Sequence, residues 1–169
     1  AMGVEPAMWP PNAALIGEAS HLLVSAAPDE AGDPVLRGVG DAIRTHASRF
    51  EWVGYLSTTG VYGDRRGDWV DETSRLDPAT RRGALRVAAE AEWRALDLPL
   101  HIFRLAGIYG PGDMRFLKLF STIQSGKFRM IGSGKIVYHF TYVDDLCRGF
   151  MTCADNPAAN GGTYILCGE

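Results

Sequence analysis

The sequence predicts an α/β domain built on an open parallel sheet, with helices that cross between successive strands. Four short apolar runs are unbroken rather than alternating, as in strands covered on both faces. Stretches with helical spacing of apolar residues separate these runs. Strands that alternate with helices favour right-handed crossovers between parallel neighbours.

The predicted strands are short runs that end at turn residues. The first stops before Pro28, and the next two lead into segments rich in glycine. Such boundaries are typical of strands that open into loops at the edge of a sheet. The expected strand ranges are 21–27, 52–58, 100–106 and 164–167.

The predicted helices are recognised by apolar stripes and end signals. Asp77 and Asp144 are expected to cap two helices, because a carboxylate accepts hydrogen bonds from the first free N–H groups. Gly126 is expected to end a third helix. The expected helix ranges are 34–46, 77–98, 115–124 and 144–156.

Two segments depart from this alternation. Residues 1–20 hold three prolines and are expected to form an irregular lead. Residues 128–142 are expected to form a small extension, with two extended pieces around a Gly-Ser-Gly turn. No repeat or linker interrupts the chain, so residues 1–169 are predicted to form a single domain.

Composition argues against several classes of protein. The chain of 169 residues has 17 basic and 20 acidic side chains, a balance that argues against a nucleic-acid partner. Its apolar runs are shorter than the roughly 18 residues of a membrane span, and no export signal is apparent. The three cysteines do not suggest a disulfide framework, so a reducing, cytoplasmic location is expected.

Three motifs carry a resemblance to a known family. The sequence STTGVYG at 57–63 ends the second predicted strand, RLAGIYGPG at 104–112 ends the third, and YVDDL at 142–146 opens the last helix. In this order they resemble the extended short-chain dehydrogenase/reductase family, the NAD-dependent epimerases and dehydratases. The resemblance covers about residues 21–168 and implies a truncated, Rossmann-like doubly wound sheet with an extension on the substrate side.

The resemblance assigns catalytic roles residue by residue. The family Ser/Thr that hydrogen-bonds the substrate oxygen falls on Thr58, flanked by Ser57 and Thr59 as candidate substrate contacts. The family Tyr and Lys, four residues apart, fall on Arg82 and Arg86. Acid–base catalysis needs a phenol that can give up its proton, and a guanidinium stays protonated. The hydride-coupled proton transfer of the family is therefore expected to be absent or impaired.

A simpler interpretation of these arginines is also open. Arg86, Glu90 and Arg94 have the spacing of ion pairs on a solvated helix face. Arg82, in a first helical turn, opposes the helix dipole, which would favour an anion nearby. Both interpretations are compatible with the sequence.

The cofactor motif of the family does not appear in this sequence. The family begins with a strand, a glycine-rich turn and a helix that binds the pyrophosphate of NAD or NADP. Only about twenty residues precede the first predicted strand, too few for that unit. The pattern Gly107-x-x-Gly110-x-Gly112 has the wrong spacing and is interpreted as a turn. The chain therefore resembles the second half of the family, and no tightly bound cofactor is expected.

Substrate positions differ from those of sugar-nucleotide enzymes as well. Those enzymes have an Asn at the position of Gly107 and an Arg near Tyr138. Tyr109, Tyr138 and His139 are candidates to line a polar, aromatic pocket instead. The histidines and cysteines lack the spacing of a metal site, so no metal is expected.

Three functional hypotheses follow from these residues. The first is an epimerase/dehydratase-like oxidoreductase with degenerate or lost redox activity. The second is a non-redox enzyme, for example a hydrolase, that reuses the cleft through Ser57 or Thr58. The third is a catalytically silent binding or assembly module. The first predicted strand would also be an uncovered edge, which favours a homodimer.

Overall fold

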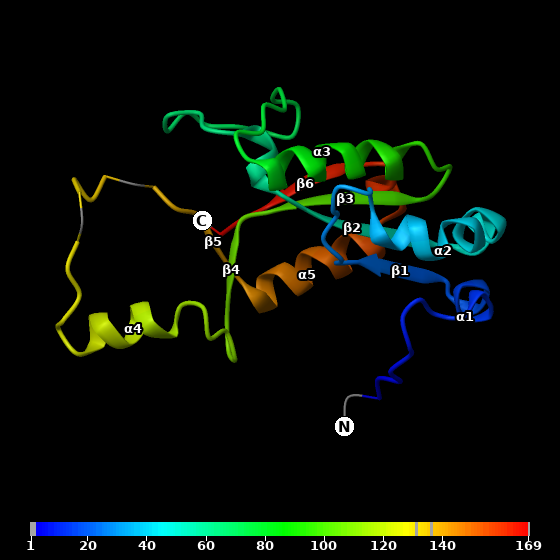
Figure 1. Cartoon of the computed structure of the whole chain (residues 1–169), viewed down its shortest axis with the longest axis horizontal. Helices are drawn as coiled ribbons and strands as arrows, with labels where there is room; N and C mark the ends of the chain where they lie inside the picture. The colour runs from blue at the N-terminus through cyan, green and yellow to red at the C-terminus, as the bar shows by residue number, and fades with distance from the viewer. Residues whose placement is uncertain (1–2, 131, 136, 169) are drawn as a thin grey trace.

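A four-stranded parallel sheet forms the centre of the computed structural model, which describes residues 3–130, 132–135 and 137–168 (Figure 1). Its strand order is β1-β2-β3-β6, and all three strand pairs are parallel. The predicted parallel sheet is confirmed, although its first strand is three residues shorter than expected. The strands are β1 (His21–Val24), β2 (Trp52–Thr58), β3 (Leu100–Leu105) and β6 (Thr163–Leu166).

Helices cover both faces of the sheet. The helices α2 (Pro34–Thr45) and α3 (Arg81–Arg94) pack on one face, and α5 (Val143–Ala154) packs on the other (Figure 1). Along β2, Val53 joins the core under α2 and α3, whereas its neighbour Trp52 joins the core under α5. Because successive side chains alternate between two buried faces, the strands have unbroken apolar sequences.

The start of α3 differs from the sequence prediction. The helix begins after Thr80, whose hydroxyl accepts a hydrogen bond from the Gly83 N–H at 3.1 Å. Asp77, expected as the cap, lies in the preceding loop and donates its N–H to the Val61 carbonyl at 3.0 Å. This bond ties residue 77 to the short turn that follows β2, so the helix starts three residues later.

Two other helix starts shift by one or two residues. The helix α5 begins at Val143, so Asp144 and Asp145 lie in its first turn and favour the helix dipole rather than capping it. The helix α4 spans Leu117–Gln124, and Arg115 lies before it, bound to Asp113. No residue of α4 is buried, and the helix extends away from the sheet in Figure 1.

The extension contains one strand rather than two among its described residues. The strand β5 (Phe140–Tyr142) pairs in parallel with β4 (Gly107–Tyr109), a strand in the segment expected to form a turn. Residues 131 and 136, within the expected extended pieces, lie outside the described residues. The lead is not wholly irregular, because it contains α1 (Ala13–Glu18).

The described residues also form the short 3-10 helices η1 (Ala47–Arg49), η2 (Thr59–Tyr62) and η3 (Pro157–Ala159). No helix in the described ranges is both long and apolar enough to cross a bilayer.

Candidate functional site

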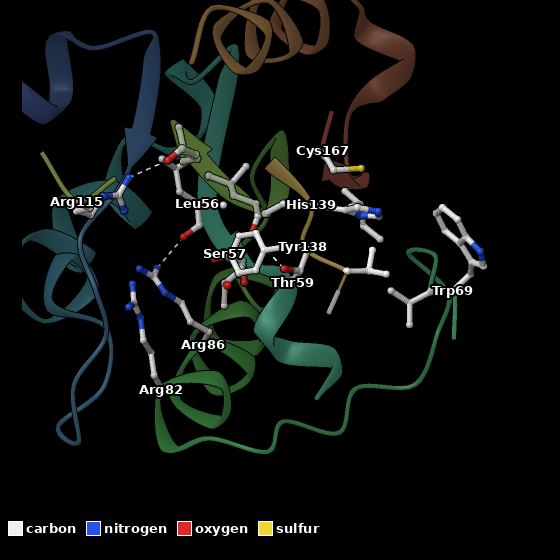
Figure 2. Close-up of a pocket in the computed structure, with 18 of the residues that line it drawn as sticks. Leu56, Ser57, Thr59, Trp69, Arg82, Arg86, Arg115, Tyr138, His139 and Cys167 are labelled. Carbon is white, nitrogen blue, oxygen red and sulfur yellow. Dashed lines mark hydrogen bonds between the residues drawn. The ribbon is translucent and has the colours of Figure 1, made fainter. Parts of the chain in front are cut away.

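A cleft of about 770 Å³ opens at the carboxyl ends of β2 and β3 (Figure 2). Ligands of open α/β sheets bind at this edge, because loops from several strands meet there. The predicted site residues found along the cleft come from β2, α3 and the extension: Ser57, Thr58, Thr59, Arg82, Arg86, Tyr138 and His139.

The hydroxyl groups of Ser57, Thr58 and Thr59, at and just after the end of β2, all form hydrogen bonds within the protein. The Thr58 hydroxyl accepts a hydrogen bond from the Gly60 N–H at 3.2 Å and so caps η2. The Thr59 hydroxyl donates to the Leu105 carbonyl at 3.4 Å. The Ser57 hydroxyl donates to Glu90 Oε1 at 2.5 Å. Of the three hydroxyls, that of Ser57 is the one hydrogen-bonded to a buried carboxylate. This bond argues against Ser57 as a nucleophile.

Glu90 is the centre of a buried charge network beneath the cleft. The Arg104 guanidinium donates to both of its carboxylate oxygens, at 3.2 and 2.8 Å. Arg94 adds a contact at 3.1 Å, as its spacing predicts. Burial raises the pKa of Glu90, but the hydrogen bonds from Arg104 and Ser57 and the charges of Arg104 and Arg94 outweigh it, so that the net shift is downward.

The interpretation that Arg86 lies on a solvated helix face is wrong. The Arg86 side chain is buried and donates Nη1–H to the carbonyls of Leu56 and Ala26, at 2.7 and 3.2 Å, and to the Tyr55 hydroxyl at 3.0 Å. It does not pair with Glu90, which binds Arg104 instead. Burial raises the pKa of Tyr55 to about 12, although the charge of Arg86 and its hydrogen bond act in the opposite direction.

Arg82 is exposed and lies one helical turn before Arg86. Its neighbour Arg81 forms an ion pair with Glu30. Within the described ranges, the Arg82 guanidinium has no ion-pair or hydrogen-bond partner. Arg82 therefore presents an unpaired positive charge to the cleft.

Aromatic side chains form the opposite wall of the cleft. Tyr138 lies over Gly107, where a Cβ atom would come within 2.5 Å of the Tyr138 ring. His139 packs against Trp69 with ring centroids 5.7 Å apart (Figure 2). Tyr109, a predicted site residue, instead packs on Tyr142 and Phe140 and does not line the cleft.

Two of the three glycines in 107–112 are closed by packing, whereas Gly112 has open space around it. A Cβ on Gly107 would meet Tyr138, and one on Gly110 would come within 2.5 Å of Val143. These two glycines permit close packing of the extension and of α5, so they leave no open backbone for a pyrophosphate. Among the described residues, no group of three or more metal-ligating side chains could hold an ion.

Sequence reasoning missed several residues of the cleft. Trp69, Asp68 and Arg115 line it from loops that follow β2 and β4. The pairing of Arg104 with Glu90 was also missed, because the two residues lie on different elements. A charged residue in the middle of an apolar strand run, such as Arg104, is a sequence feature that points to a buried partner.

Comparisons with known proteins identify relatives of this fold. A model of the NAD dependent epimerase/dehydratase family matches residues 38–167. A probable UDP-glucuronate 4-epimerase from Rhizobium meliloti is 28% identical over 111 residues, 60% of this chain and 32% of that protein. The chain therefore spans about a third of this curated relative.

Solved structures share the same arrangement. A functionally unknown conserved protein from Silicibacter pomeroyi DSS has a TM-score of 0.78 and 45% identity, covering 98% of this chain and 55% of that one. The UDP-glucuronic acid 4-epimerase from Bacillus cereus in complex with NAD has a TM-score of 0.70 and 20% identity, covering 93% and 56%. At that identity the second likeness supports the fold alone.

Proposed function

Because the chain belongs to the NAD dependent epimerase/dehydratase family, we propose that it is the substrate-side half of an epimerase/dehydratase-like protein with degenerate redox activity. The proposal rests on two arginines, Arg82 and Arg86, at the positions that the resemblance assigns to the family Tyr and Lys. Arg86 is held by two carbonyls and a phenol, and Arg82 faces the cleft without a partner in the described ranges. A guanidinium cannot exchange a proton near neutral pH.

Neither Tyr55 nor Tyr62 is suited to replace the acid–base tyrosine of the family. Burial raises the pKa of Tyr55, and it also raises the pKa of Tyr62, against the hydrogen bond and charge of Arg104. Acid–base work near neutral pH needs the opposite shift. Tyr55 and Tyr62 are therefore structural partners of Arg86 and Arg104.

A sugar nucleotide is a poor fit for this half of the site. The position where sugar-nucleotide enzymes of the family have an Asn is Gly107, and the Tyr138 ring occupies the space that its side chain would fill. An Asn at 107 would displace Tyr138. The cleft is therefore suited to a different small molecule.

NAD or NADP is the cofactor of the family, and the family's glycine-rich pyrophosphate motif has no match in this sequence. The proposal accordingly assigns no reaction step to a nicotinamide. Thr58 remains the residue on which any surviving activity should depend, since its hydroxyl lies at the end of β2 in the cleft wall.

The test is a screen for nicotinamide-linked turnover. The purified chain is incubated with NAD or NADP and a panel of alcohols and sugars. Net dehydrogenation is followed by the absorbance of the reduced cofactor, and epimerisation, which regenerates the oxidised cofactor, is followed by NMR of the sugar products. We expect no turnover above that of a heat-denatured sample. Saturable turnover that Thr58→Ala abolishes would overturn the proposal.

The assembly of the protein forms part of the same proposal. The strand β1 lies at the edge of the sheet, and Leu23 within it is 49% exposed. An edge with free backbone groups pairs readily with another chain, which favours a twofold homodimer. The three free thiols fit the reducing cytoplasm, the location we propose.

A further inference from the structure

Two arginines of α3 line the cleft from adjacent turns of the helix. Arg82 and Arg86 are four residues apart, so their side chains lie on one helix face (Figure 2). Like charges at this spacing repel, and Arg82 in the first turn also opposes the helix dipole. In the described ranges no carboxylate forms an ion pair with either arginine, and Glu90 is bound by Arg104, Arg94 and Ser57.

Both arginines retain N–H groups for a ligand. The three contacts of Arg86 all use Nη1, and neither Nε nor Nη2 is among the buried unpartnered atoms of the described chain. Within the described ranges these two nitrogens have no hydrogen-bond partner, and the side chain, although only 6% exposed, lines the cleft. Arg82 is exposed with its whole guanidinium available. A guanidinium presents paired N–H donors that match the two oxygens of a carboxylate or phosphate.

The rest of the cleft adds an apolar, aromatic surface. Tyr138, Phe116 and Trp69 line it, and Trp69 is 88% exposed. In Figure 2 Trp69 and His139 lie on the side of the view opposite the two arginines. Among the described lining residues, Asp68 is the one carboxylate, and Arg82, Arg86 and Arg115 are the arginines, of which Arg115 is paired with Asp113. The cleft is thus positively charged at one end and aromatic at the other.

We propose that this cleft binds a small amphipathic anion, an aromatic molecule with a carboxylate or phosphate group held by Arg82 and Arg86. The proposal rests on the proposed function, because it assigns a substrate class to the same cleft. The anionic group would lie where the family places its acid–base pair, and the ring would lie against the aromatic wall. Aromatic rings stack favourably at such a wall.

The experiment is an NMR-detected titration of the full chain without any cofactor. The probes are benzoate, phenyl phosphate and the neutral benzamide, which has nearly the shape of benzoate. We expect saturable shifts at the backbone amides of Thr58, Arg82 and Tyr138 with benzoate or phenyl phosphate, and none with benzamide at equal concentration. The tighter of the two anions identifies a carboxylate or a phosphate as the natural group.

A matched pair of variants separates the site from general charge. Arg82→Gln should weaken anion binding about tenfold, because it removes a direct charged contact. Arg81→Gln removes the same charge one residue away, from a side chain already paired with Glu30, and should change binding by less than about twofold. Both side chains are exposed, so both variants are expected to fold; their amide spectra check this.

Three results would overturn the inference. These are equal binding of benzamide and benzoate, equal weakening by the two variants, or no saturable shift with either anion. Because no cofactor is present, these outcomes are independent of the turnover screen. Anion binding would therefore survive as a finding even if the chain proved to catalyse redox chemistry.

Discussion

Replacing Arg104 with Leu removes the main hydrogen-bond partner of the Glu90 carboxylate, which has no access to water. Glu90 is 0% exposed and Arg104 3% exposed, and the guanidinium binds both carboxylate oxygens. The same side chain also donates to the Tyr62 hydroxyl at 2.8 Å. In the variant, Ser57 and Arg94 would be the remaining partners of Glu90.

The expected cost follows from the burial of the charge. Breaking a buried ion pair from one side costs about 3–5 kcal/mol, because the other charge is left in a medium of low polarity. A domain is stable by about 5–15 kcal/mol in total, so this loss is a large fraction. For a chain of this length it corresponds to a drop in Tm of roughly 6–20 °C.

The loss should also depend on pH. The pKa of Glu90 is lowered in the folded protein, so its contribution is present above the unfolded pKa near 4.5 and is lost as the pH falls through the folded value. In Arg104→Leu the buried carboxyl favours its protonated form instead. The difference in unfolding free energy between the two proteins should therefore narrow as the pH is lowered from 7 to about 4.

The assay is urea unfolding followed by tryptophan fluorescence at several pH values. Arg148→Leu is the control, since Arg148 pairs with Asp145 on the surface with 75% of its side chain exposed, and should cost no more than about 1 kcal/mol. The double variant Glu90→Leu/Arg104→Leu should be more stable than Arg104→Leu alone. A loss for Arg104→Leu no larger than for the control would refute the reasoning.

Three further predictions concern stability and assembly. Burial lowers the pKa of His101 below its ordinary value of 6.5, and hydrogen bonds with backbone groups offset part of this shift. As the pH falls, His101 therefore becomes protonated in the unfolded chain before it does in the folded protein. The free energy of unfolding should accordingly decrease as the pH drops below 6.5. Urea titrations should show a weaker decline over this range for His101→Phe, and an unchanged decline would contradict the assignment. Gly63→Ala should lower Tm by several degrees in calorimetry, because residue 63 has φ 74° and a Cβ would overlap the Asp77 carbonyl; an unchanged Tm would show that the loop relaxes. Light scattering after size exclusion should show a dimer at micromolar concentration, and a monomer of 18.4 kDa at every concentration would contradict the pairing of β1 edges.

The sheet was predictable because its strands are encoded locally. Both neighbours in a pair such as Trp52 and Val53 are apolar, since each faces a separate core. The site was less predictable, because its charges pair across elements. Glu90 and Arg86 have the spacing of a helical ion pair, but the Glu90 carboxylate binds Arg104 from β3 instead. Nothing within α3 alone distinguishes these two arrangements.

The first residue of a helix was also hard to predict, because it depends on contacts with other elements. Thr80 and Asp77 are both good capping residues, and the hydrogen bond from residue 77 to the Val61 carbonyl decides between them. The resemblance in three short motifs was confirmed by the family match over residues 38–167. The roles of Thr58 and Arg82 stay predictions, since they depend on ligands.

The central proposal is that this part of the family fold binds the family cofactor weakly or not at all, and a calorimetric titration with NAD and NADP tests it most directly. We predict a dissociation constant in the millimolar range or weaker for both, because the family's glycine-rich pyrophosphate motif has no match in this sequence. Binding of either dinucleotide in the micromolar range would contradict it.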